Sequence, residues 1–117
     1  MKRIPRTYGC PVEVSLELLG GKWKPVILAR LKDSPLSYGQ LRSAIPALSD
    51  KVLTERLKAL TEQGLVVREP DALAPDRNLY QLTERGRSLR PVLEALYAWG
   101  QAAARDLDLR IRDGATR

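Results

Sequence analysis

The sequence contains no histidine and only one cysteine, Cys10. These absences exclude the usual zinc-binding spacings, a histidine-based catalytic triad and a disulfide within the chain. No other group of residues assembles a nucleophile, a base and an oxyanion site. We therefore expect a protein that is not an enzyme and that uses neither a metal nor a cofactor.

Long apolar runs are also missing. Charged residues interrupt each apolar segment well before it reaches membrane-spanning length, and the N-terminal MKRIPRTYGC lacks the apolar stretch of a signal peptide. We expect a cytoplasmic protein that makes no contact with a membrane.

The composition indicates one globular domain with a basic surface. The 117 residues are 44% hydrophobic, which suits a single modest core. Lys and Arg number 20 against 14 Asp and Glu, and the net charge of +6 favours a polyanionic partner. We expect a flexible basic arm at residues 1–8, a folded domain at residues 9–109 and a disordered tail at residues 110–117.

Three short helices are predicted in the first half of the chain. PVEVSLELLGG opens with a proline and closes with two glycines, which is typical of a helix over residues 11–19. KWKPVILARLKD places Ile27 and Leu31 four apart, which predicts a second helix. SYGQLRSAIP begins with Ser37, and Gln40 completes a capping box for a third helix.

A fourth helix is predicted between Ser49, a good N-cap residue, and Gly64, which suits a left-handed stop with Leu65 folded back on the helix. Its apolar stripe consists of Leu53, Leu57 and Leu60. Its opposite, polar stripe consists of Lys51, Thr54, Glu55 and Lys58. The apolar stripe suits a core, whereas the polar stripe is available for a partner.

A hairpin and a long helix are predicted to follow. LVVRE and NLYQL indicate two strands separated by the polar loop PDALAPDR. ERGRSLRPVLEALYAWGQAAARDL indicates a helix in which Pro91 marks either a kink or a first turn capped by Ser88. Its wide apolar face comprises Leu89, Val92, Leu93, Leu96, Trp99, Ala103 and Leu107. A second copy of the chain is the simplest cover for this face.

The predicted order of elements is typical of one DNA-binding fold. Two helices joined by a few residues and followed at once by a hairpin form a winged helix-turn-helix, here mainly α with a small β-hairpin. In that layout the second helix of the pair enters the major groove of DNA. The sequence therefore predicts that the polar stripe of the fourth helix faces bases and phosphates.

Three collinear blocks run from about Cys10 to Gly100. They are CPVEVSLELLGGKWKPVIL, LSYGQLRSAIPALSDKVLTERLKALTEQGLVVRE and LYQLTERGRSLRPVLEALYAWG. Their most specific pieces are the CP dipeptide, GGKW, the S-x-K-x-L-T pattern at residues 49–54 and LTE-x-GRSL at residues 82–89. Together these blocks resemble the HxlR-type winged helix-turn-helix transcription regulators of bacteria.

The resemblance implies a homodimer formed through the first and last helices. This dimer would bind a pseudo-palindromic operator in the nucleoid DNA with sequence specificity, and we expect it to act as a repressor. In part of that family, small reactive molecules or oxidants act through the cysteine at the position of Cys10. Asp71 and Asp76 depart from the family, which often has a tyrosine and a second proline in those neighbourhoods. Phosphates would repel these carboxylates, which argues against direct contact between the wing and DNA.

The candidate DNA-binding residues are Lys22, Gln40, Ser49, Lys51, Thr54, Glu55, Lys58 and Arg77. Structural roles compete with several of these assignments. The alternative interpretation of Lys51 and Lys58 is that both are ordinary solvated lysines, with Lys51 paired to Glu55 one turn away. Ser49 has a sufficient role as a helix cap, and Gln40 has one in the capping box.

Cys10 is either a small apolar filler or a sensor. It stands just before the helix that begins at Pro11, where the helix dipole favours a thiolate, and Arg3 and Arg6 are near in sequence. A disulfide would have to join two subunits or capture a small thiol. Two further hypotheses are the same DNA-binding dimer controlled by a noncovalent small-molecule ligand, and a winged helix that binds proteins.

Overall fold

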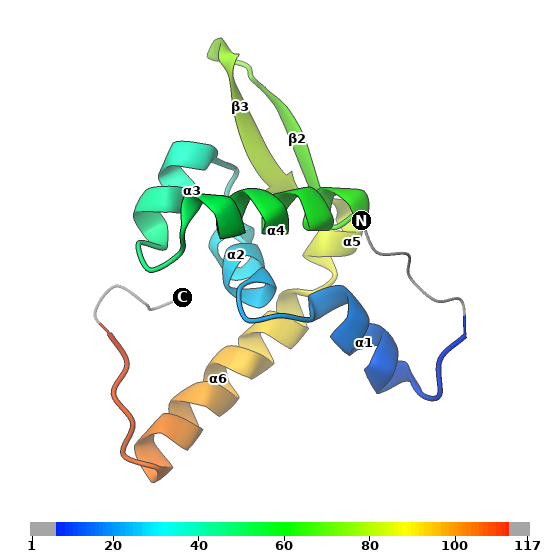
Figure 1. The fold of residues 1–117 in the computed structure, drawn as a ribbon, viewed down its shortest axis with the longest axis vertical. Helices are drawn as coiled ribbons and strands as arrows, with labels where there is room; N and C mark the ends of the chain where they lie inside the picture. The colour runs from blue at the N-terminus through cyan, green and yellow to red at the C-terminus, as the bar shows by residue number, and fades with distance from the viewer. Residues whose placement is uncertain (1–6, 113–117) are drawn as a thin grey trace.

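The computed structural model describes residues 7–112. Most of the predicted arm and tail, with Arg3 and Arg6, therefore lies outside the described residues. The elements are, in order, α1 (Pro11–Leu19), α2 (Lys24–Leu31), β1 (Leu36–Ser37), α3 (Tyr38–Ala44), α4 (Asp50–Glu62), β2 (Val66–Asp71), β3 (Ala74–Leu82), α5 (Glu84–Arg87) and α6 (Arg90–Asp106) (Figure 1). The architecture is the predicted winged helix-turn-helix, mainly α with a small antiparallel sheet.

The limits of α4 are set by local chemistry at its two ends. Ser49 is the N-cap, and its Oγ accepts a hydrogen bond from the Val52 amide at 3.2 Å. Gly64, at φ 76°, takes the left-handed conformation that a side chain would disfavour. The Leu65 amide then donates to the Leu60 carbonyl at 3.0 Å, which closes a Schellman motif. Both predicted ends of this helix are confirmed.

The hydrophobic core lies between α4 and the helices α2 and α3, and it extends to the base of the sheet and the start of α6. Its buried residues are Ile27, Leu28, Leu31, Leu41, Ile45, Leu48, Leu53, Leu57, Leu60, Leu65, Val66, Leu82 and Leu93. The predicted apolar stripe of α4 is wholly inside this core, because Leu53, Leu57 and Leu60 are 0–3% exposed. The core therefore fixes which face of α4 points outward.

The wing differs from its prediction, because the segment expected to be a loop belongs mostly to the strands. The ladder that begins at the pair Val66 and Leu82 continues to the pair Asp71 and Ala74, so that residues 72–73 alone form the turn. The segment looked like a loop because it is polar and contains two prolines, but a wing that projects from the core exposes both of its faces. The two-residue strand β1, which pairs with β3, was not predicted.

The last helix of the prediction is divided into α5 and α6 by a turn at Ser88 and Leu89. Pro91 lies in the first turn of α6 and not at a kink, as the second of its two predicted alternatives had it. The N-cap of α6 is Leu89, so the predicted cap at Ser88 is wrong. Gly86 allows α5 to approach the sheet, since a Cβ atom there would overlap the Leu65 carbonyl oxygen.

The helices α1 and α6 lie at the end of the molecule opposite the wing (Figure 1). Neither buries much of its surface: α1 has no buried residue, and α6 buries only Leu93 and Ala104. Within residues 7–112, every helix is too short or too polar to cross a membrane.

Candidate nucleic-acid interface

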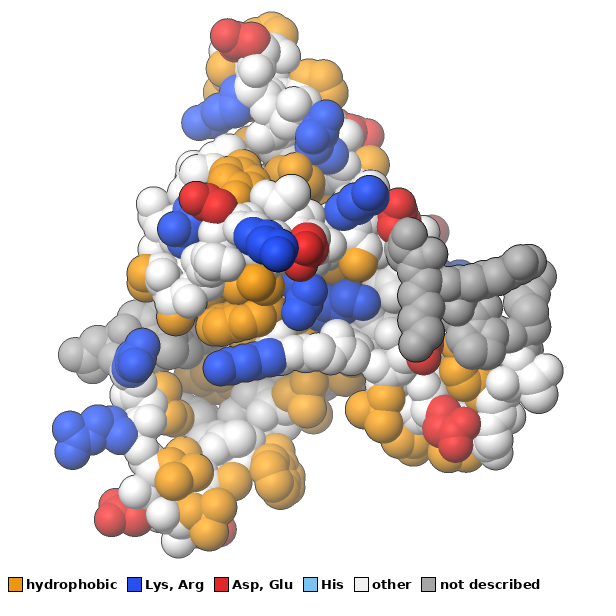
Figure 2. All heavy atoms as spheres, in the orientation of Figure 1, with side chains coloured by type: hydrophobic (Ala, Val, Ile, Leu, Met, Phe, Trp, Pro, Cys, Tyr) orange, Lys and Arg blue, Asp and Glu red, His pale blue; other side chains and the backbone are white. Residues whose placement is uncertain are grey.

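The outward face of α4 carries the four polar residues of the predicted stripe, Lys51, Thr54, Glu55 and Lys58. All four are exposed, and no other element covers them. Figure 2 shows basic side chains interspersed with acidic ones on the face of the molecule to which α4 belongs. Among the described residues, Glu55 lies within ion-pair distance of Arg56, at 4.0 Å, and not of Lys51. The side chain of Lys51 is therefore available to a partner.

A polar clamp of Tyr38, Arg42 and Asp50 fixes the start of α4 against α3. The Tyr38 hydroxyl donates to Asp50 Oδ1 at 2.9 Å, and Arg42 Nε donates to the same oxygen at 2.7 Å. Arg42 also donates to the Leu48 carbonyl at 2.6 Å, within the turn between the helices. Thr54 Oγ1 lies 3.3 Å from the Tyr38 hydroxyl oxygen, so the clamp reaches the polar stripe itself.

The clamp makes the stability of the domain depend on pH. The hydrogen bonds from Tyr38 and Arg42 hold the pKa of Asp50 below its usual value. Because the folded pKa is the lower one, this stabilisation is present above the unfolded pKa of about 3.9 and is lost as the pH falls through the folded value. We predict that Asp50→Asn lowers the free energy of unfolding more at pH 6 than at pH 3, as urea denaturation measures. An equal loss at both pH values would contradict the clamp.

Ser49 and Gln40 lie at the N-termini of α4 and α3, and both take part in capping. Gln40 Oε1 accepts from the Ser37 amide at 2.8 Å while the Gln40 amide donates to Ser37 Oγ at 3.1 Å, which confirms the capping box. The Nε2 group of Gln40 is not used by the box, and both residues are exposed. Their structural roles thus leave them at the surface, where a helix N-terminus favours an anion such as phosphate.

The two lysines beside Trp23 differ in their surroundings. Lys22 is exposed, and its ammonium lies 5.0 Å from the centre of the Trp23 ring. Lys24 is only 9% exposed, and its Nζ donates to Gln63 Oε1 at 3.1 Å. Burial, aided by the nearby Arg56 guanidinium, lowers the pKa of Lys24. Lys24 therefore supports the C-terminal end of α4, and Lys22 alone of this pair reaches the surface.

The two carboxylates of the wing have opposite environments. Asp71 is 7% exposed and accepts hydrogen bonds from Arg77 Nη2 at 2.7 Å and Nε at 3.2 Å. Asp76 is exposed. The repulsion of phosphate that was expected from both carboxylates therefore applies to the exposed Asp76, whereas Asp71 is buried in the wing and paired with a cation.

Cys10 lies at the N-cap of α1 and is exposed, so it does not fill the core of its own subunit. It makes no side-chain capping bond. Glu13 in the first turn instead holds the residue before the cap, because Glu13 Oε1 accepts from the Gly9 amide at 2.8 Å. The sulfur is thus left accessible at the positive end of the helix.

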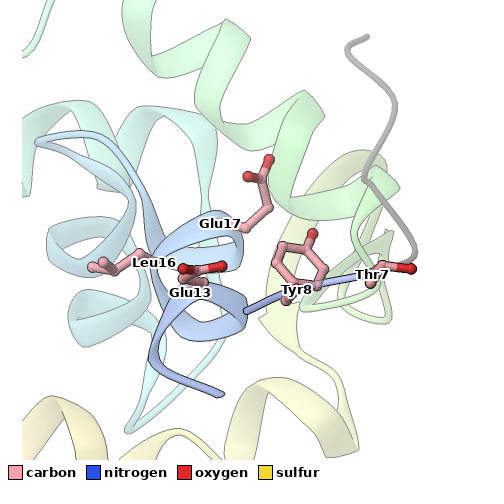
Figure 3. Close-up of a pocket in the computed structure, with 5 residues that line it drawn as sticks. All are labelled: Thr7, Tyr8, Glu13, Leu16 and Glu17. Carbon is pink, nitrogen blue, oxygen red and sulfur yellow. The ribbon is translucent and has the colours of Figure 1, made fainter. Parts of the chain in front are cut away.

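A shallow pocket lies beside Cys10 on α1 and is lined by Thr7, Tyr8, Glu13, Leu16 and Glu17 (Figure 3). The Tyr8 hydroxyl is buried and has no hydrogen-bond partner within residues 7–112. Burial and the carboxylate of Glu17 raise the pKa of Tyr8. In the described part of the chain, no group of three His, Cys, Asp or Glu side chains is arranged to hold a metal ion.

Two pairings of functional interest were not predicted from the sequence. The clamp joins Tyr38 to Asp50 across a turn, and no periodicity links residues 12 apart. The pair Asp71 and Arg77 lies in the segment that was expected to be a loop, so no strand register was predicted that would relate the two residues. The exposed stripe was found because a helical period with an apolar face is a local signal.

Comparison with known proteins agrees with this geometry. Residues 18–107 match the HxlR-like helix-turn-helix family. An uncharacterized HTH-type transcriptional regulator of Methanothermobacter thermautotrophicus is 42% identical over 94 residues, which cover 80% of this chain and 72% of that protein. The reduced form of the redox regulator HypR superposes with a TM-score of 0.75 at 34% identity, covering 84% of this chain and 96% of that one.

A further solved structure, the quinone-bound YodB of B. subtilis, superposes with a TM-score of 0.66 at 34% identity and covers 80% of this chain and 99% of its own. The matched proteins are transcriptional regulators with a DNA-binding fold, and proteins of this kind are not enzymes. The family match spans the helix-turn-helix, the wing and the whole of α6. This chain is a member of the HxlR-like helix-turn-helix family of transcriptional regulators.

Proposed function

We propose that two copies of the chain form a homodimer that binds a pseudo-palindromic operator and represses transcription by occupying it. One observation carries this proposal: the polar stripe of α4 is exposed along its length while the leucines behind it are buried in the core. A helix that packs against the core on one side and is polar on the other suits insertion into the major groove. A dimer seated there would keep other proteins off the same DNA.

The residues of the stripe divide between phosphates and bases. Lys51 and Lys58 would neutralise phosphates and release condensed counterions, which gives affinity but little sequence preference. Thr54 and Glu55 lie between them on the same face and would contact base edges, where a glutamate accepts from the amino group of cytosine. Ser49, at the positive end of α4, would bind a phosphate.

The dimer is supported by the apolar surface of α1 and α6. Large apolar side chains are exposed on α1, on α6 and just after α6, and monomeric proteins seldom expose extended apolar patches. Their exposed fractions are 62% for Val12, 64% for Leu16, 50% for Leu96, 74% for Trp99 and 67% for Leu107. Figure 2 shows apolar side chains gathered at the end of the molecule that these helices form. A second copy packed there would place two α4 helices on one side of the duplex, where they must lie about 34 Å apart.

Cys10 is the proposed sensor of this dimer. Its sulfur is accessible, and the regulators HypR and YodB, which share the fold, are described as a redox regulator and as a protein with bound quinone. An oxidant would take two electrons from two Cys10 thiols, one in each subunit, with loss of two protons and formation of one disulfide. A quinone would instead form a carbon–sulfur bond, and the thiol proton would pass to the quinone oxygen. Either change lies beside the proposed dimer helix α1.

Footprinting on the DNA upstream of the protein's own gene tests the sensor. The parent is expected to protect a palindromic site and to lose that protection when an oxidant or a quinone is added. Cys10→Ser should protect the same site and keep it under both treatments. If Cys10→Ser still responds, the thiol is not the sensor.

A noncovalent ligand is the second candidate for control. The observation in its favour is the pocket beside α1, where the Tyr8 hydroxyl has no hydrogen-bond partner within residues 7–112 and the carboxylates of Glu13 and Glu17 line the same space. A response retained by Cys10→Ser and lost by Tyr8→Phe would favour this candidate. If the parent shows no affinity for any duplex even at low salt, the fold serves as a protein-interaction module instead.

A further inference from the structure

The tip of the wing is built around one carboxylate. Asp71 Oδ1 accepts from the Leu73 amide at 3.0 Å and so closes the two-residue turn, while Asp71 Oδ2 accepts both bonds from Arg77. The register of the two strands shifts by three residues between Pro70 and Asp71, so that Asp71 pairs with Ala74 and Arg77 lies in a bulge of β3 between Ala74 and Asn78. The carboxylate thus joins the turn and the bulge in one rigid unit.

The pairing leaves part of the Arg77 guanidinium available. Asp71 uses Nε and one N–H of Nη2, and Nη1 is outside the pair. The Arg77 side chain is 52% exposed, whereas that of Asp71 is 10% exposed. The cation therefore lies on the solvent side of the pair and the anion on the protein side. A phosphate that approached this tip would meet the guanidinium first.

We propose that Asp71 is a positioning residue, which holds Arg77 ready to bind a phosphate of the DNA backbone. This inference rests on the proposed DNA-binding function and assigns the wing a part in it. A free arginine loses several rotamers when it binds, and a partner that already restrains it removes part of that cost. The same restraint directs the remaining N–H groups outward, where a phosphate accepts them.

A positioning role for Asp71 and simple repulsion of phosphate predict opposite effects of an Asp71 replacement on DNA binding. If Asp71 only repelled phosphate, its replacement by asparagine would remove a negative charge and strengthen DNA binding. If Asp71 positions Arg77, the same replacement weakens DNA binding, because the neutral amide holds the guanidinium poorly. Asp76 offers a matched control, since it is an exposed carboxylate of the same hairpin, on β3, and its replacement changes the charge by the same amount.

The experiment measures binding of a fluorescent duplex carrying the footprinted site, by anisotropy at several salt concentrations. We expect Asp71→Asn and Arg77→Lys to weaken binding by roughly 2- to 10-fold at each half-site, the range that ordering one long side chain implies. In an Arg77→Ala background, Asp71→Asn should have no further effect. Asp76→Asn should bind as tightly as the parent or more tightly.

Two outcomes separate this inference from the proposed function. If the parent binds the duplex and Asp71→Asn binds at least as tightly as Asp76→Asn, the positioning role is wrong and the proposed function stands. If the parent binds no duplex, both are wrong. Urea denaturation of Asp71→Asn shows whether the wing variant is folded, and Arg77→Lys, which leaves Asp71 in place, tests the same contact independently.

Discussion

Replacing Lys51 and Lys58 together by alanine is expected to weaken operator binding by roughly 100-fold at each half-site, since one charge-assisted hydrogen bond contributes about 1.5 kcal/mol, or about tenfold. Both side chains are exposed on the same face of α4, two turns apart, where they would flank the groove. Each lost phosphate contact should also lower the slope of log affinity against log salt by about 0.9. Anisotropy titrations at several salt concentrations give both quantities.

The control removes the same charge from outside α4. Arg110 and Arg112 are exposed and follow α6, and both are replaced by alanine. This variant should keep the salt slope of the parent and nearly all of its affinity. If it loses as much affinity for the operator as the α4 variant does, the net charge of the protein rather than the polar stripe explains binding. If Lys51→Ala alone binds as tightly as the parent, α4 is not the recognition helix.

Leu57→Ala is expected to lower the free energy of unfolding by about 2–5 kcal/mol. Leu57 is 3% exposed and belongs to the buried stripe that fastens α4 to the core. Truncation removes apolar contacts and leaves a cavity that the rigid neighbours fill only in part. Urea denaturation of the purified variant measures the loss.

A neighbouring residue on the opposite face serves as the control for stability. Lys58→Ala should change the free energy of unfolding by no more than about 0.5 kcal/mol, as is usual for an exposed position. The two variants therefore separate the face that holds the helix from the face that meets DNA. A loss at Leu57 as small as that at Lys58 would mean that the apolar stripe does not anchor α4.

The part of the fold that was predicted from the sequence depends on interactions between near neighbours. The caps at Ser37 and Ser49 and the stop at Gly64 each use residues within a few positions of one another, so that their spacing is visible in the chain. The two stripes of α4 follow from the helical period for the same reason. The exposed polar face of α4 was therefore predictable as a surface, and its contacts with DNA stay predictions.

The part that was missed depends on where strands pair and where helices cross. The register shift after Pro70 has no signature in a polar segment with two prolines, and it places Arg77 in a bulge of β3 whose side-chain pairing with Asp71 no sequence pattern states. The bond between Tyr38 and Asp50 requires the angle between α3 and α4, which no sequence pattern states. The pairing of Asp71 with Arg77 and the clamp were consequently not predicted.

If the exposed face of α4 lies in the major groove, it covers guanine N7, which faces that groove, so methylation of this atom in the bound operator is the most direct test. We expect two patches of guanine N7 protected from dimethyl sulfate, one helical turn apart, and loss of both patches in the Lys51→Ala and Lys58→Ala double variant. Full methylation of every guanine in an operator that the protein demonstrably occupies would contradict it.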